Sequence, residues 1–331
     1  MDLILEVADD LVLDNMWAKL VPIPDVTSTV NAYTTENMTQ AFPNSWLSAV
    51  ATNLPSVLLP PPPSSILVES ISLSGQSAWP RDYVLRQLLS VTVITLIGIH
   101  LLYFVFAAAS YFFVFDHRMM KHPRFLKNQV KLEIHTSLKS FPGMLLLTLP
   151  WFQGEVMGYS RLYNDPKEYG IAYLFFSIFL FLIVTDYCIY WIHRWLHLPF
   201  LYKHIHKPHH KWLVPTPFAS HAFHPVDGFS QSLPYHLFVY IFPMQRHLYL
   251  ILFNLVNIWS VFIHDSDMFV SPGGRVEKYI NTPAHHTLHH LYFTCNYGQY
   301  FTWADRLGGS YRPPQPDLDP LKEALAACKS E

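Results

Sequence analysis

The chain has 331 residues, of which 51% are hydrophobic and 16% aromatic, whereas Asp, Glu, Lys and Arg together make up only 14%. Because soluble domains carry roughly 25% charged residues, this composition argues against an ordinary soluble enzyme and favours a membrane-embedded protein. The formal net charge of −2 gives no reason to expect a nucleic-acid partner.

The composition changes along the chain and predicts four segments. Residues 1–17 are predicted to form a short amphipathic helix. In residues 18–80 Pro, Ser, Thr and Asn dominate, which indicates an irregular or partly polyproline II insert. Its sequon at Asn37 is a glycosylation site only if it faces a lumen, and an unmodified loop is an equally good interpretation. Residues 81–311 are predicted to be a membrane-embedded domain with the metal site, and residues 312–331 a solvated cytosolic tail.

A first membrane span is predicted at residues 84–115, which exceed the ~20 apolar residues that a helix needs to cross a bilayer. Five basic residues follow within residues 118–131, so the positive-inside rule makes this loop cytosolic. Residues 141–152 are apolar but short, and Pro142 and Pro150 at their ends suggest half of a kinked span.

A second strong span is predicted at residues 171–192, and basic residues follow it as well. Two more apolar segments, residues 232–243 and 248–263, contain Pro234 and Pro243 and suggest a re-entrant or hairpin geometry. The predicted fold is therefore an all-α integral membrane protein with about four transmembrane or re-entrant helices. A cytosolic, histidine-rich helical cap is predicted to hold a dinuclear metal site.

Eight histidines form three clusters, namely His193 and His197; His206, His209 and His210; and His286, His289 and His290. Neutral imidazole is the commonest protein metal ligand. Residues three and four apart share a helix face, so each cluster can aim its rings at one point. Because a zinc site closes with four ligands and an octahedral ion with six, eight imidazoles predict two metals. The alternative, a set of structural or pH-sensing imidazoles, is disfavoured because all three clusters lie on one side of the membrane.

Three residues near the clusters are predicted to complete the set of metal-binding histidines, here called the cage, or to orient its rings. His264 ends an apolar helix and is predicted to be the ninth ligand, with Asp265 as an acceptor for its ring. Asp186 is an acid inside a span, which is costly and usually functional. It is predicted to be the partner of His193 or His197.

Four other residues are weaker candidates for the site. His224 is a possible ligand, and Asp227 stands three residues later, where it can hold that ring. His221 and His285 lie beside the clusters in the sequence but outside the helix faces assigned to the eight clustered histidines. They are predicted to be hydrogen-bonding neighbours of the ligands or residues on the substrate side.

Ligand type alone does not choose the metal, since imidazole suits zinc, copper, iron and nickel. The chain has no H-E-x-x-H, E-x-x-H, G-x-S-x-G or nucleotide-binding motif. A redox reaction would therefore need electrons from another protein. An all-histidine dinuclear site in a membrane suits activation of O2 against an unreactive C–H bond, which is a task for iron rather than zinc.

The histidine clusters carry a family resemblance. In sequence, order and separation, H-R-W-L-H, H-K-P-H-H and H-H-T-L-H-H resemble the histidine boxes of the membrane fatty acid hydroxylase superfamily. The flanking sequence is similar to its sterol C5-desaturase (lathosterol oxidase) branch, at residues 1–9, 116–130, 215–229, 231–236, 257–265 and 296–302. The resemblance covers about residues 1–17 and 79–311.

The resemblance implies a multi-pass enzyme of the endoplasmic reticulum membrane with its metal site facing the cytosol. It implies removal of two hydrogens across C5–C6 of a Δ7-sterol, with two iron ions, O2, and electrons from NADH through cytochrome b5 and its reductase. No catalytic residue is expected beyond the metal ligands. The basic loop 118–131 is either a docking surface for acidic cytochrome b5 or a topology signal alone.

Two other functions remain open from the residues. A sterol C4-methyl oxidase or fatty acyl hydroxylase of the same superfamily would use the same boxes, and only the flanking sequence favours desaturation. A metal transporter or sensor would also use histidines. It would, however, place ionisable residues deep in several spans, where few are found here apart from Asp186 and His100.

Overall fold

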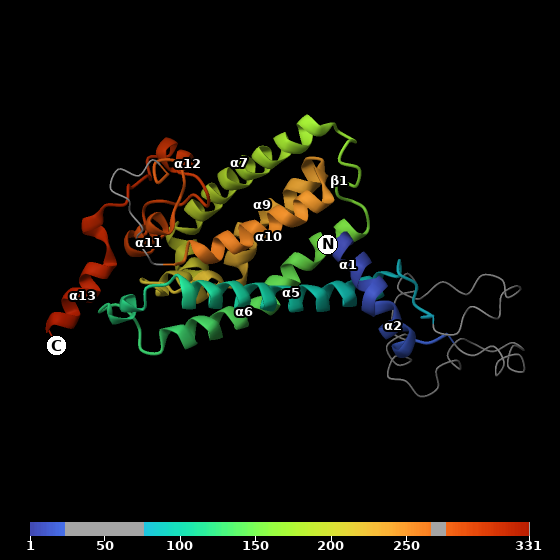
Figure 1. The fold of residues 1–331 in the computed structure, drawn as a ribbon, viewed down its shortest axis with the longest axis horizontal. Helices are drawn as coiled ribbons and strands as arrows, with labels where there is room; N and C mark the ends of the chain where they lie inside the picture. The colour runs from blue at the N-terminus through green and yellow to red at the C-terminus, as the bar shows by residue number, and fades with distance from the viewer. Residues whose placement is uncertain (24–75, 266–275, 331) are drawn as a thin grey trace, which may run out of the picture. The chain divides into compact units, whose positions relative to one another are not determined.

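The computed structural model describes residues 1–23, 76–265 and 276–330. The predicted sequon at Asn37 and most of the predicted insert therefore lie outside the described residues. The chain divides into two compact units, Met1–Ile94 and Thr95–Glu331, and the described parts of both are mostly helical (Figure 1).

The N-terminal unit opens with a continuous helical segment, made of α1 (Asp2–Ala8), the π-helical η1 (Asp9–Leu13) and α2 (Asp14–Leu20). This segment contacts the first turns of the next long helix. The buried Arg86 donates to Asp9 at 2.9 Å, and the indole of Trp17 donates to Ser90 at 3.0 Å. Arg86 interrupts the first apolar stretch of the sequence, and a buried charge of this kind is tolerated because it is paired.

Two helices of the described chain are long and apolar enough to cross a membrane, α5 (Val84–Phe113, 30 residues) and α7 (Ile171–Leu196, 26 residues). At 1.5 Å per residue they extend about 45 and 39 Å, more than the ~30 Å hydrocarbon core of a bilayer. They coincide with the two strong spans predicted from the sequence. The predicted total of about four transmembrane or re-entrant helices stays a prediction.

Helix α6 (Gln129–Val156, 28 residues) differs from the predicted short half-span. Pro142 and Pro150 lie inside this helix and do not bound it. A proline removes one backbone hydrogen bond and normally kinks or breaks a helix. Here packing of α6 against α9 (Pro225–Ile241) and η7 (Pro217–His221) supports one continuous helix through both positions.

A helical hairpin corresponds to the predicted pair of apolar segments. Helix α9 and helix α10 (Arg246–Phe262) have 17 residues each, and the short strand β2 (Met244–Gln245) joins them. This strand pairs in parallel with β1 (Leu162–Tyr163), which precedes α7. Phe181, Ile189, Tyr235, Phe238 and Val256 form much of the core that α7 and the hairpin share.

Shorter helices follow the C-terminal end of α7 and form the cap. They are α8 (Pro199–Leu201), η5 (Tyr202–His206), η6 (His209–Lys211), η7, α11 (Pro283–Tyr292) and α12 (Trp303–Leu307). Figure 1 shows α11 and α12 beside the C-terminal end of α7.

The C-terminal tail contains a helix, whereas the sequence predicted only a solvated end. Helix α13 (Pro320–Ser330) packs against η4 (His117–Lys121), which lies in the basic loop after α5. His122, at the end of η4, approaches the carboxylate of Glu323 to 3.1 Å. The basic loop is thus partly covered by the tail.

Close packing between α6 and α9 gives the first prediction. A Cβ at Gly143 would lie 2.7 Å from both Cβ and Cγ of Pro225, and a proline ring cannot rotate away. We expect Gly143→Ala to destabilise the protein by about 1–3 kcal/mol, the usual range for overpacking. Gly98→Ala in α5 is the control, since nothing lies within 4 Å of its added methyl group. Thermal unfolding in detergent measures both, and a Gly143→Ala protein that melts no lower than the control would contradict this packing.

Candidate metal centre

Nine histidines from four parts of unit 2 converge on one region. The C-terminal end of α7 provides His193 and His197, and η5 with η6 provides His206, His209 and His210. His264 follows α10, and α11 provides His286, His289 and His290. All of them except the half-buried His197 are buried. These are the nine residues that the sequence predicted as ligands.

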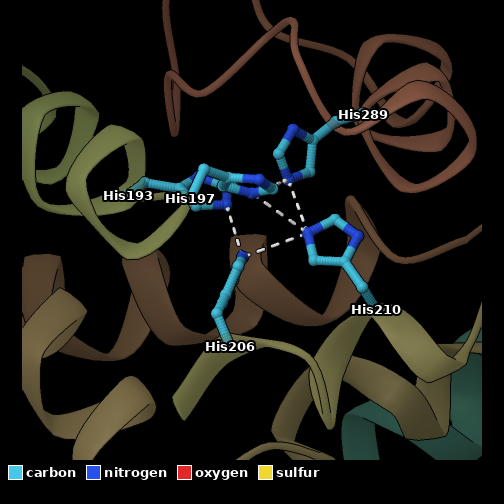
Figure 2. A group of neighbouring side chains, drawn as sticks. All are labelled: His193, His197, His206, His210 and His289. Atoms are coloured by element: carbon cyan, nitrogen blue, oxygen red, sulfur yellow. Dashed lines mark hydrogen bonds between the residues drawn. The ribbon is translucent and has the colours of Figure 1, made fainter. Parts of the chain in front are cut away.

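The nine rings form two adjoining groups. The first contains His193, His197, His206, His210 and His289, and Figure 2 shows their rings turned toward one another. The second contains His209, His264, His286 and His290. Within each group the possible ligand atoms all lie within 4.8 Å of one another. The rings of His210 and His290, one from each group, have their centroids 4.9 Å apart, so the groups are neighbours.

The spacing of the Nε2 atoms fits coordination of a metal ion. In the first group, Nε2 of His210 lies 3.2, 3.1 and 3.1 Å from those of His197, His206 and His289. In the second, Nε2 of His264 lies 3.3 and 3.0 Å from those of His209 and His286. Nitrogens bound at about 2.0–2.1 Å to one ion are separated by about 3.0 Å at right angles and about 3.4 Å at tetrahedral angles. The donor set therefore fits two metals, one in each group.

The opposite ring nitrogen, Nδ1, is held in five of the nine histidines. That of His206 lies 2.7 Å from the Asp227 carboxylate. The other four face backbone carbonyl oxygens, with His193 on Tyr297, His264 on Ser260, His289 on Cys295 and His290 on Trp212, at 2.6–3.0 Å. An Nδ1–H that donates in this way leaves Nε2 free as a metal ligand and fixes the ring.

Burial keeps imidazoles in both groups neutral. It lowers the pKa of His209, His210 and His289 well below the usual value, and neighbouring imidazoles lower it further. Burial also lowers the pKa of His264 to about 4. Since a metal binds the neutral imidazole, these rings are in the ligand form at neutral pH.

The acids near the cage contact other groups than the sequence suggested. Asp227 was expected to hold His224, but its carboxylate accepts from His206. The exposed His224 instead caps α9 and lies in neither group. Asp265 was expected to orient His264, but it accepts from Ser110 at 3.0 Å.

Asp186 acts on the cap backbone and not on a ligand ring. Its Oδ1 accepts the N–H groups of residues 299, 300 and 301 at 3.1, 2.7 and 3.3 Å. The two preceding amides, of residues 297 and 298, donate to the buried carboxylate of Asp305 at 2.9 and 2.8 Å. Five successive amides are thus fixed by two carboxylates. This clamp holds the carbonyl of Tyr297 against His193, so Asp186 reaches the cage indirectly.

The two remaining candidates lie beside the cage. Nδ1 of the buried His221 faces the hydroxyl of Ser220 at 3.0 Å, and burial lowers the pKa of His221 to about 3. His285 lies in the N-terminal turn of α11, where its ring accepts from the backbone N–H of Thr282 at 3.2 Å. Both residues lie beside the nine histidines, and neither belongs to the two groups.

A cavity of about 80 Å³ adjoins the cage. Its wall contains four of the nine histidines, His193, His209, His264 and His286. The remaining wall is mixed, with apolar side chains from α6, α7 and α10 and polar side chains from η7, α9, α10 and the segment after α11. The cavity therefore brings apolar and polar side chains next to the converging histidines.

The comparisons with known proteins agree with this architecture. A model of the fatty acid hydroxylase family matches residues 178–310, from within α7 to the end of the cap. The chain is 49% identical to the Delta(7)-sterol 5(6)-desaturase ERG3B of Gibberella zeae, over 100% of this chain and 95% of that protein. It is 52% identical to the lathosterol oxidase of Homo sapiens, over 72% of this chain and 80% of that protein. No solved structure matches the chain.

Membrane-capable helices, a histidine cage at the end of one of them and the matching family model define a protein of the fatty acid hydroxylase class. Within this class, the chain belongs to the family of the Delta(7)-sterol 5(6)-desaturases. The resemblance found in the histidine boxes and their flanks is confirmed.

The contact between Asp227 and His206 gives the second prediction. Asp227→Asn keeps the shape of the side chain but removes the charge that favours an Nδ1–H on His206. We expect metal affinity to fall about 10- to 100-fold, as for other partners of ligating histidines. Titration of metal into the chelator-treated protein measures this change. Asp116→Asn, at the N-cap of η4, is the control, and equal affinities of the two variants would refute the role of Asp227.

Proposed function

We propose that this chain is a Delta(7)-sterol 5(6)-desaturase, which introduces the C5–C6 double bond into Δ7-sterols. The observation that carries the proposal is the identity of 45–53% to proteins of that name, together with a cage of nine converging imidazoles. The proposal places the enzyme in the endoplasmic reticulum membrane with its cage on the cytosolic side. The basic residues that follow α5 and α7 support this orientation.

The nine histidines are proposed to hold two iron ions, five imidazoles facing one and four the other. Five imidazoles exceed the four ligands with which structural zinc sites close, which favours a metal of higher coordination number. Bound iron would supply the redox chemistry that activates O2 for attack on an unreactive C–H bond. The protein's own contribution is to bind and orient the sterol beside the cage and to exclude bulk water.

The balance of the reaction explains the need for an electron donor. Removing two hydrogen atoms from the sterol supplies two electrons and two protons, whereas reduction of O2 to two waters takes four of each. Two electrons must therefore come from outside, and we assign them to NADH through cytochrome b5 and its reductase. The sequence contains neither a G-x-G-x-x-G motif nor a P-loop, which supports an external donor.

Expression of the chain in cells that lack sterol C5-desaturation tests the proposal. We expect the accumulated Δ7-sterol to fall and the Δ5,7-sterol to appear, as measured by mass spectrometry of extracted sterols. Unchanged Δ7-sterol in the presence of well-expressed protein would contradict the proposal. Correction of a defect that accumulates 4-methyl sterols would reassign the chain as a methyl oxidase.

Loss of one ligand from either group should abolish turnover. His289→Ala removes a ligand from the group of five and His209→Ala one from the group of four. We expect less than about 1% of wild-type desaturation in both, because loss of a group required for catalysis costs orders of magnitude in rate. His204→Ala is the matched control, since this histidine is exposed and lies in neither group. Substantial activity in either variant, at normal expression, would argue against the assignment of that ligand.

A further inference from the structure

The cavity beside the cage contains more polar side chains than a hydrocarbon substrate needs. Besides the histidines and Tyr235, they are Ser220, Gln231, Ser232, Asn257, Ser260 and Gln299. Four of these are engaged within the protein. Ser220 pairs with His221 at 3.0 Å, Gln231 donates to Asp227 at 2.8 Å, and Ser232 and Asn257 donate to carbonyls of their own helices at 2.9 and 2.6 Å.

Two polar side chains of the cavity wall have no hydrogen-bond partner within the described residues, Ser260 and Gln299. Ser260 lies inside α10, where a serine hydroxyl can return its hydrogen bond to the carbonyl of the preceding turn. Gln299 lies outside the helices, so its amide has no preceding helical turn whose carbonyl it could use. The Gln299 amide therefore offers a donor and an acceptor to whatever occupies the cavity.

The backbone of Gln299 is fixed on both sides. Its N–H donates to Asp186 at 3.1 Å, and its carbonyl accepts from the indole of Trp259 at 2.9 Å. The following residue, Tyr300, is held as well, because its hydroxyl lies 2.6 Å from that of Tyr235 in α9. A side chain on so well supported a backbone is pre-organised, which lowers the entropy cost of binding a ligand.

We propose that the amide of Gln299 binds the 3-hydroxyl group of the sterol substrate. This inference rests on the proposed function. The 3-hydroxyl is the single polar group of a simple sterol, and one ring carbon separates the carbon that bears it from C5. If the C5–C6 bond lies against the ligands of the cage, the hydroxyl lies in the same cavity. A space of about 80 Å³ holds only one end of a sterol, and the hydroxyl-bearing end is the polar one.

The assignment gives Gln299 a role in specificity. Bound substrate satisfies the amide, whereas a bound sterol without the hydroxyl covers the half-buried amide and leaves it unpaired. Such mismatches cost more than the loss of an apolar contact. Gln299 should thus set the register of the sterol along the cavity and bring C5 and C6 opposite the ligands.

The test compares two substrates with three proteins. The substrates are a Δ7-sterol and its 3-deoxy analogue, and the proteins are the wild type, Gln299→Met and the exposed control Gln315→Met. Methionine matches glutamine in length and lacks its hydrogen bonds. For the wild type and the control we expect kcat/KM to be about tenfold higher with the hydroxyl, the upper range for one neutral hydrogen bond. For Gln299→Met we expect a ratio below about twofold, with turnover of the 3-deoxy sterol retained.

The outcomes separate this inference from the proposed function. A Gln299→Met ratio equal to that of the wild type, or an equal loss with both substrates, would overturn the role of Gln299 and leave the desaturase assignment intact. Failure of metal-loaded wild type to desaturate either sterol would overturn both. Metal content and thermal unfolding show whether the variant is folded, and Gln299→Leu replaces Gln299→Met if the latter is not.

Discussion

Burial of nine imidazoles around two points is the constraint on which the rest of the site depends. Moving so many polar rings out of water is costly unless each finds a partner. The Nε2 atoms find only one another, at 3.0–3.3 Å, so the arrangement makes sense as a set of ligands. The long helices bring the sequence segments together, and the carbonyls and the carboxylate that face Nδ1 turn the rings inward. Fold and chemistry are therefore linked, because the histidines whose burial costs free energy are the same ones that offer their Nε2 atoms to a metal.

The sequence predicted well which histidines converge, and it predicted poorly which groups support their rings. Spacings of three and four residues place His193 with His197, and His286 with His289 and His290, on common helix faces, and this rule needs no tertiary information. The carbonyls of Trp212, Cys295 and Tyr297 could not be predicted, because every residue carries one. Their role arises only when the cap folds. Acids near a cluster were wrongly paired for the same reason, since distance in sequence does not show which ring a carboxylate reaches.

The membrane-capable helices were predicted from length and composition, and α5 and α7 match. Helix α6 differs, because the prolines in it were read as ends. That rule holds where nothing supports the backbone, whereas α6 packs against α9 and η7. The C-terminal helix was missed because the prolines from Pro313 onward suggested an irregular end. Pro320 stands at the first helical position, where proline is tolerated, and the residues that follow it are good helix formers. Packing against η4 supports the helix further.

The carboxylates of Asp186 and Asp305 hold five consecutive amides between residues 297 and 301. Such a segment has no freedom to slide, because a shift of one position would break every bond at once. A Cβ at Gly298 would also lie 2.5 Å from the carbonyl oxygen of Phe301 and 3.0 Å from the Asp305 carboxylate, so this position accepts only glycine. Evolution or a protein engineer can therefore exchange the other side chains of this segment but cannot insert or delete a residue. New substrate preferences in this family should arise in this stretch by replacement, at constant loop length.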